Sequence, residues 1–259
     1  MVSGIAFLFV TVVSLGEQNP PPQTANGFRA ASADKTTPEK TAKSLTPEVR
    51  GDIFMARKMY REAIEIYQQA PQNSAVIANK TGIAYHQLLD FASAKKLYER
   101  AIKLNPKYPE AINNLGTIYY AGKSYRRAVS QYRKALALVP DSASFLSNLG
   151  TAYFARKNYA EAFATYQKAL ALDPDVFEHR GTAGVLLLER SVEERAKYHY
   201  YLARSYAQAG QTERAIQYIR KALEEGFKER EKFQTEPEFA SLRDNDEFKQ
   251  LMTMEQKVL

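Results

Sequence analysis

A spacing of 34 residues organises the central part of this chain, from Ala75 to Val176. One pattern of small residues, aromatic residues and a closing proline is written there three times at this interval. The agreeing slots are Gly82, Tyr85, Ala94, Tyr98, Ala101 and Pro106, then Gly116, Tyr119, Ala128, Tyr132, Ala135 and Pro140, then Gly150, Tyr153, Ala162, Tyr166, Ala169 and Pro174. A fixed period of this length is typical of stacked structural repeats, in which neighbouring copies bury a shared core.

Each copy is predicted to fold as two helices joined by a turn, because apolar residues recur in each half at helical spacing. In the middle copy, the first helix carries Ile112, Leu115, Ile118 and Tyr119, and the second carries Tyr125, Ala128, Val129, Tyr132, Ala135 and Leu136. The small residues Gly116 and Ala128 allow the two helices of one copy to approach closely. Pro140 and Pro174 are expected to end second helices, since proline cannot continue a helix.

These slots and their interval resemble the tetratricopeptide repeat, a helix–turn–helix unit that stacks into arrays. The resemblance implies an all-α fold, a right-handed α-solenoid of stacked antiparallel helix pairs. It further implies about five units and a C-terminal capping helix.

The resemblance has one recurrent departure, in the turn between the two helices. Where the family usually places glycine, this chain has Lys58, Lys123 and Lys157. A non-glycine residue is uncommon at a position with positive φ. These lysines would form a basic stripe along one edge of the array, or simply a solvated turn of slightly different geometry, and we favour the solvated turn.

The domain organisation is built around three full repeats at 75–108, 109–142 and 143–176. The other predicted segments are a signal peptide or N-terminal anchor at 1–16, a disordered linker at 17–43, a degenerate first repeat at 44–74, an insert loop at 177–195, a further repeat at 196–229 and a C-terminal cap at 230–259. The first repeat is expected to be short because Pro71 stops its second helix. After the insert, Ser191 is expected to cap a helix, with Glu194 three residues later.

The N-terminal segment favours export to the periplasm or the cell envelope. Ile5 to Leu15 is an apolar run of eleven residues, which has the length of a signal-peptide core and is short for a membrane span. Gly16 is small enough for a cleavage site, although no Lys or Arg precedes the run. The next residues, 17–43, are too poor in apolar side chains to order themselves.

Charge is unevenly distributed along the chain. From Glu224 to Leu259 there are 6 Lys/Arg against 10 Asp/Glu, and the rest of the chain has 30 against 19. The basic body keeps single-stranded nucleic-acid binding open as an alternative function, although most tyrosines fall in packing slots. There is no cysteine, which excludes a disulfide framework, a thiolate metal site and a cysteine nucleophile.

The sequence contains no catalytic motif and predicts a protein that is not an enzyme. The chain has three histidines, His86, His179 and His199. None of them lies at metal-ligand spacing from another histidine or a carboxylate, so we expect no metal and no cofactor. His86 is expected on the surface or in the groove of the array. A site formed by Glu178 and His179 in the insert is the weaker, enzymatic hypothesis.

The resemblance implies that the first helices line a concave groove in which exposed slots bind partners. The candidate groove residues are Asn113, Asn114, Thr117, Tyr120, Ser147, Asn148, Thr151 and Phe154. An asparagine side chain can pair with both N–H and C=O of an extended peptide, and aromatic rings add apolar contact area. A two-cation clamp known in some family members is not expected, because only Asn114 agrees among Asn79, Ile83, Asn114, Ser144 and Asn148.

The leading functional prediction is therefore a non-catalytic scaffold for protein–protein interaction. Its groove would bind an extended peptide or assemble an envelope complex. The expected partner is a protein or peptide, and contact with a membrane is expected only through the N-terminal segment if that segment is uncleaved.

Overall fold

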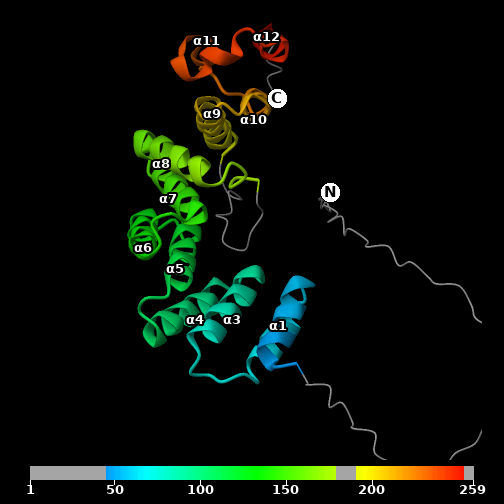
Figure 1. The fold of residues 1–259 in the computed structure, drawn as a ribbon, viewed down its shortest axis with the longest axis vertical. Helices are drawn as coiled ribbons and strands as arrows, with labels where there is room; N and C mark the ends of the chain where they lie inside the picture. Colours follow the sequence, from blue (N-terminus) through cyan, green and yellow to red (C-terminus); the bar gives the residue numbers. More distant parts are fainter. Residues whose placement is uncertain (1–44, 179–190, 254–259) are drawn as a thin grey trace, which may run out of the picture. The chain divides into compact units, whose positions relative to one another are not determined.

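The computed structural model describes residues 45–178 and 191–253 (Figure 1). The chain divides into one unit of Met1–Lys43 and a second of Ser44–Leu259. The predicted signal segment 1–16 and linker 17–43 lie outside the described residues, as does most of the insert. All the described residues belong to the second unit.

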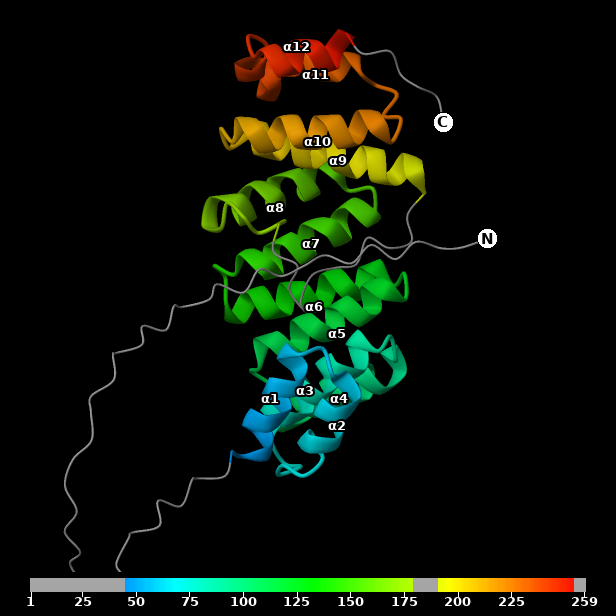
Figure 2. The same ribbon diagram turned by 90° about the vertical axis from the view of Figure 1, so that its right-hand side faces the viewer.

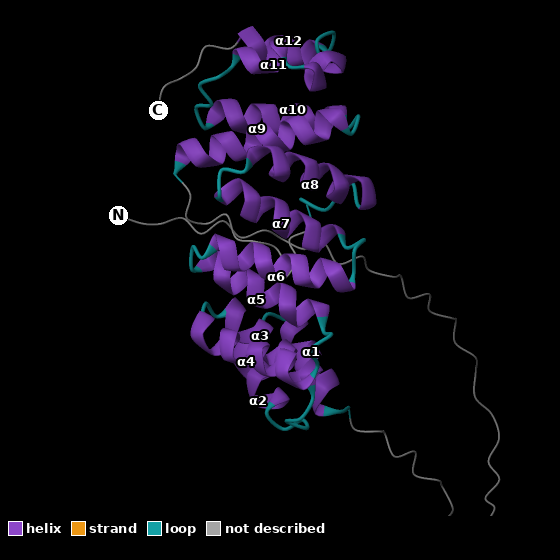
Figure 3. Ribbon diagram, turned by 90° about the vertical axis from the view of Figure 1, so that its left-hand side faces the viewer, coloured by secondary structure: helices purple, strands orange, loops and turns teal. Residues whose placement is uncertain are grey.

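The described residues are helical and contain no strand. The helices are α1 Pro47–Ala56, α2 Tyr60–Tyr67, α3 Ala75–Gln87, α4 Phe91–Leu104, α5 Pro109–Ala121, α6 Tyr125–Leu138, α7 Ala143–Ala155, α8 Tyr159–Leu172, α9 Val192–Gln208, α10 Thr212–Glu224, α11 Glu231–Thr235 and α12 Asp246–Thr253, with a 3-10 helix η1 at Pro237–Leu242. Figure 3 shows short loops between the helices, apart from the connection from α8 to α9, most of which lies outside the described residues.

The helices form an all-α solenoid of stacked pairs, which confirms the predicted fold class. The pairs are α1 with α2, α3 with α4, α5 with α6, α7 with α8 and α9 with α10. The second helix of each pair also packs on the first helix of the next, so helices of neighbouring pairs lie side by side (Figure 2). We call α1, α3, α5, α7 and α9 the first helices, and α2, α4, α6, α8 and α10 the second helices.

A contact between glycine and tyrosine sets the distance between the two helices of a repeat. Tyr132 on α6 is fully buried, and a Cβ placed on Gly116 of α5 would lie 2.7 Å from its ring. The equivalent distance is 2.7 Å for Gly82 and 2.5 Å for Gly150. Real Cβ atoms do not approach that closely, so only glycine fits against the ring.

In the fifth repeat, different side chains form the close contact between the two helices. Ala203 and Ile219 occupy the glycine and tyrosine slots there, and both are fully buried. Isoleucine does not reach as far as tyrosine, which leaves room for one methyl group on the facing helix. The two slots therefore vary together.

The turn inside each repeat has one residue in the left-handed region. Its φ is 59° at Lys58, 62° at Leu89, 56° at Lys123 and 63° at Lys157, and Gly210 at the same slot has 72°. Only the fifth repeat has the residue that adopts this conformation without steric cost. The three lysine turns therefore do have the positive φ that glycine would favour.

The two ends of the array differ from its middle. Helix α2 has 8 residues where α4, α6 and α8 have 14, as expected from Pro71.

The predicted cap of α9 is confirmed. Ser191 accepts a hydrogen bond from the backbone N–H of Glu194 at 3.2 Å.

The C-terminal segment has more elements than the single capping helix that the resemblance implied. It forms α11, η1 and α12, which cover the aromatic side chains packed around Tyr200 in the middle of α9. Tyr200 of α9 stacks on Phe227 with ring centroids 4.5 Å apart, and Phe233 packs edge-on against Phe239 at 5.2 Å. Four apolar residues of η1 and α12 are buried in this cap, namely Phe239, Leu242, Phe248 and Leu251.

Gly116→Ala tests the glycine–tyrosine contact. The added methyl group must displace the Tyr132 ring, so we expect the free energy of unfolding to fall by about 1–3 kcal/mol. In a Tyr132→Ile background the same change should cost clearly less, as the pair Ala203 and Ile219 indicates. Chemical denaturation of the four proteins of this cycle measures the difference.

Gly122→Ala is the matched control, because a Cβ at Gly122 meets only ordinary contacts, the nearest at 3.6 Å. This control should leave stability unchanged or slightly raised. Equal losses at Gly116 and Gly122 would show that the tyrosine contact is not what excludes a side chain.

Lys157→Gly tests the strain in the turn. Lys157 is exposed and has φ of 63°, so glycine should raise the free energy of unfolding by about 0.5–1 kcal/mol despite its greater freedom in the unfolded chain. Lys157→Ala, which keeps the steric conflict, should not stabilise. The reciprocal change Gly210→Ala should destabilise by about 1 kcal/mol, and thermal melts of the three variants decide the matter.

Candidate functional site

The first helices α5 and α7 carry the eight residues that the sequence placed in an exposed groove. The structure buries seven of the eight, namely Asn113, Asn114, Thr117, Tyr120, Asn148, Thr151 and Phe154, and leaves Ser147 half-buried. The expectation that these slots are exposed is therefore wrong. The physical reason is that α5 contacts both α3 and α7, and the polar side chains pair across these contacts.

Asparagines from successive first helices form a ladder of side-chain hydrogen bonds. The Nδ2 of Asn114 donates to Oδ1 of Asn79 at 3.0 Å, and the Nδ2 of Asn148 donates to Oδ1 of Asn113 at 3.1 Å. Both bonds join residues 35 positions apart, one more than the period. The two bonds therefore use the same pair of slots in successive repeats.

An ion pair occupies the same two slots at the N-terminal end of the array. Lys80 of α3, in the slot of Asn114, lies 2.7 Å from Glu48 of α1, in the slot of Asn113. Lys80 also contacts Asp52 at 2.7 Å. We call the set Glu48, Lys80, Asn79, Asn114, Asn113 and Asn148 the polar seam. After α7 the slots hold Ser147 and Tyr201, so the amide pairing does not continue.

The threonines connect the polar seam to the core of each repeat. Thr117 accepts a hydrogen bond from the hydroxyl of Tyr132 at 3.2 Å, and Thr151 accepts one from Tyr166 at 3.4 Å. Each threonine donates in turn to a backbone carbonyl one helical turn earlier, Thr117 to that of Asn113 at 3.3 Å. Burial raises the pKa of the Tyr132 hydroxyl, so it stays a neutral donor at physiological pH.

His86 is buried, which corrects the expectation that it lies on the surface or in an open groove. The second repeat has Ile83 in the threonine slot, and the hydroxyl of Tyr98 instead lies 3.5 Å from Nδ1 of His86. Phe91 packs edge-on against the imidazole at 5.5 Å. Burial lowers the pKa of His86, so the neutral ring acts as a structural partner of the tyrosine.

The remaining titratable groups singled out from the sequence show no catalytic arrangement among the described residues. Nδ1 of His199 lies 2.8 Å from the Glu225 carboxylate. Glu178 accepts hydrogen bonds from the hydroxyls of Tyr218 at 3.0 Å and Tyr206 at 3.4 Å. His179 lies outside the described residues. Within the described ranges, no three His, Asp or Glu side chains gather as metal ligands.

A cleft of about 340 Å³ opens between α2 and α4, with α3 as its floor. The short α2 ends before it can cover this part of α4. The lining includes Gln68, Gln72, Thr81, Tyr85, Lys96 and Arg100. Ile77, Ala78 and Leu97 also line it, so the cleft has a mixed polar and apolar wall, with the two cations on α4.

The polar seam could have been read from the sequence through one signal. Asn113 and Asn114 occupy adjacent slots, and Asn79 and Asn148 repeat one slot each at a distance of one period. Adjacent slots on one helix face different neighbours, so pairing between helices was open to inference. The resemblance implied that these slots are exposed, which is incompatible with pairing between helices.

Comparison with known proteins agrees with the repeat architecture. Sequence models of the tetratricopeptide repeat match residues 119–176 and 186–227, residues 48–107, and residues 97–129. Together these matches cover most of the described chain. No described helix is long and apolar enough to cross a membrane.

A curated relative is the photosystem I assembly protein Ycf3 of Rippkaea orientalis (strain PCC 8801 / RF-1). It is 28% identical over 76 residues, which are 29% of this chain and 43% of that protein. The chain thus spans less than half the length of this relative.

Solved structures of MamA are also similar. MamA from Desulfovibrio magneticus RS-1, from residue 41 to its end, gives a TM-score of 0.48 at 21% identity, covering 69% of this chain and 92% of that one. MamA AMB-1 gives 0.48 at 23% identity, covering 70% and 98%.

The double-mutant cycle of Asn79→Ala and Asn114→Ala tests the polar seam. Each single change leaves a buried amide without its partner, so each should lower the free energy of unfolding by about 1–3 kcal/mol. The double variant should lose less than the sum, with a coupling of at least about 0.5 kcal/mol. The exposed Asn73→Ala is the control and should stay within about 0.5 kcal/mol of wild type. Strict additivity would contradict the pairing.

Proposed function

This chain belongs to the tetratricopeptide repeat family, and on that premise we propose that it is a non-catalytic scaffold which binds a segment of a partner protein along its first helices. The observation that carries the proposal is an exposed slot that recurs at one position of α3, α5 and α7, beside the polar seam. Repetition at a constant spacing suits an extended segment, whose own groups also recur along its length.

The polar seam supports this function as a rigid frame. Its amides are already hydrogen-bonded to one another, so they hold neighbouring first helices at a fixed spacing. A frame that does not rearrange on binding lowers the entropic cost of association. We therefore propose that the partner contacts exposed residues beside the polar seam.

The slot three residues before the seam provides such contacts. Val76, Glu110 and Ser144 occupy it on α3, α5 and α7, and all three are exposed. Residues three apart share one face of a helix, so this row runs beside the seam residues Asn79 and Asn113. Half-buried Ser147, which donates to the carbonyl of Ser144 at 2.9 Å, lies on the same face.

The proposed scaffold would serve the assembly of other proteins. The similarity to a photosystem I assembly protein supports a role in assembling other proteins, at the level of that class alone. We place this role in the cell envelope because of the apolar run from Ile5 to Leu15. N-terminal sequencing of the protein from its host tests the placement. A start at Glu17, or an intact chain in the membrane fraction, supports it, and an intact chain in the cytosol contradicts it.

Site-specific photo-cross-linking tests the first-helix surface. A benzophenone amino acid is placed at Ser144 of α7 and, as a control, at the exposed Gln217 of α10. We expect a protein adduct in the native host from position 144 and not from position 217. The same adduct from both positions, or none from 144, contradicts the assignment.

The captured protein is then purified for a direct binding measurement. Ser144→Arg and Glu110→Arg should each weaken its binding about tenfold or more, because a bulky cation enters the contact surface. Gln217→Arg should leave binding unchanged. Unaltered binding by both first-helix variants would overturn the proposal.

A further inference from the structure

Positive charge is concentrated in the middle of the array. Residues 91–138 contain ten Lys or Arg and only two Asp or Glu, whereas the whole chain has a net charge of +7. This segment is α4, α5 and α6 with the turns between them. The rest of the molecule is therefore close to neutral, and the field of the protein originates here.

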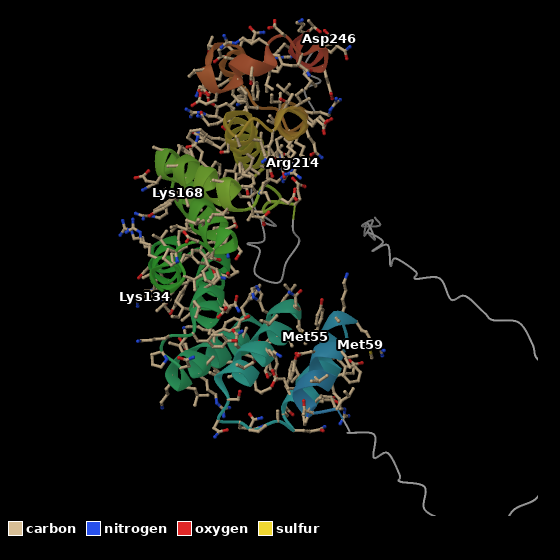
Figure 4. The ribbon with its side chains drawn as sticks, in the orientation of Figure 1. Met55, Met59, Lys134, Lys168, Arg214 and Asp246 are labelled. Carbon is tan, nitrogen blue, oxygen red and sulfur yellow. The ribbon has the colours of Figure 1, made fainter. Side chains whose placement is uncertain are left out.

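One slot of the second helices carries a cation in four successive repeats. Arg100 of α4, Lys134 of α6 and Lys168 of α8 are exposed and lie one period apart, and Lys221 of α10 fills the same slot. Figure 4 shows Lys134 of α6 and Lys168 of α8 on the same side of the array. We call these four residues the cationic row.

A row of leucines accompanies the cationic row. Leu104, Leu138 and Leu172 are the last residues of α4, α6 and α8, and they are 42%, 39% and 46% exposed. Each lies four residues after a cation of the row. Residues four apart lie on one face of a helix, so cations and leucines form a single amphipathic surface.

Carboxylates of the described chain do not neutralise this surface. The side chains of Lys134 and Lys168 make no ion pair with any described residue, and Arg100 contacts the backbone carbonyl and side chain of Gln72 rather than an acid. Four arginines near the C-terminal end of the described chain are paired with acids, such as Arg204 with Glu238 at 2.5 Å. The surface thus has unused capacity for anions.

The C-terminal end of the molecule shows how a second helix accepts an acidic segment. Helix α12 begins with Asp246 and Glu247 and packs on α10. Glu247 pairs with Arg220 at 2.5 Å, next to Lys221 of the cationic row, while Phe248 is buried. Two repeats earlier, the slot of Arg220 is filled by Arg133, which is exposed on α6.

We propose that the cationic row and its leucines are a docking surface for an acidic segment of a partner protein that also carries apolar side chains. This surface lies on the second helices and is additional to the first-helix surface proposed above. The carboxylates would pair with Lys134 and Lys168, and the apolar side chains would cover Leu138 and Leu172.

Two other polyanions fit the surface less well. Single-stranded nucleic acids are held largely by bases stacked on aromatic rings, and Tyr98, Tyr132 and Tyr166 of the second helices are fully buried. Tyr125 of α6 and Tyr159 of α8 are half-buried and already pack on Tyr120 and Tyr201. Insertion into a membrane needs an apolar face that enters the lipid, about 5–10 Å deep. The leucines keep more than half of their surface covered by the array, so they form a shallow patch suited to side chains of a docked segment.

Binding of defined probes to the full chain tests the proposal. The probes are a fluorescein-labelled peptide of repeated Glu-Glu-Leu-Glu, the same peptide with serine in place of leucine, a dT oligonucleotide, and vesicles of phosphatidylcholine with phosphatidylserine. Fluorescence anisotropy and vesicle sedimentation should rank the Glu-Glu-Leu-Glu peptide first. Stronger binding of the oligonucleotide or the vesicles, or no binding of the peptide, overturns the proposal.

Charge-reversal variants then locate the surface. The variant Lys134→Glu with Lys168→Glu should weaken peptide binding about tenfold or more. The control Lys58→Glu with Lys157→Glu alters two exposed turn lysines and changes net charge equally, so it should have less than about a twofold effect. Equal loss in both would mean that only net charge matters, which contradicts a defined surface.

A third variant tests the apolar half of the surface. Leu138→Ser with Leu172→Ser should weaken the leucine-containing peptide severalfold and leave the serine peptide unchanged, with thermal melts confirming folding. No loss would contradict the role of the leucines. Cross-linking from Ser144 tests the first-helix surface independently. Failure of the peptide to bind the second helices would therefore not contradict the first-helix proposal.

Discussion

The whole array depends on the contact between a glycine of each first helix and a tyrosine ring of the second. With Gly116 against Tyr132, the two helices lie closer than any side chain at position 116 would allow. The ring is then fully buried, and its hydroxyl reaches Thr117 across the hairpin. Since the same contact recurs in the repeats of Gly82 and Gly150, each hairpin presents nearly the same surface to the next.

This regularity gives the molecule two unlike faces. On the first helices, polar side chains are close enough to satisfy one another, as Asn114 does with Asn79, and the seam becomes part of the structure. On the second helices, cations such as Lys134 and Lys168 repeat without nearby acids and stay in solvent. The same period thus pairs polar side chains with one another on the first helices and leaves cations on the second helices free to bind anions.

At the two ends of the array, the terminal helix pair has no neighbouring repeat among the described residues to cover its apolar face. At the C-terminus, α11, η1 and α12 cover the aromatic side chains around Tyr200, and Arg204 pairs with Glu238 of η1. At the other end, Val49 and Ile53 of α1 remain 43% and 36% exposed. Later repeats bury the slot of Ile53 under the preceding helix, and the described chain has no helix before α1.

The amino-acid sequence by itself determined the repeat, because spacing and slot identity follow directly from the need of stacked hairpins to bury identical faces. It also determined the short first repeat, through Pro71, and the cap at Ser191. Only the tertiary structure decided which polar residues are exposed. Asn113 and Asn148 look like groove residues in one helix, but their burial arises from a neighbouring helix 35 residues away. Exposure is a property of two elements together, and a pattern within one element cannot report it.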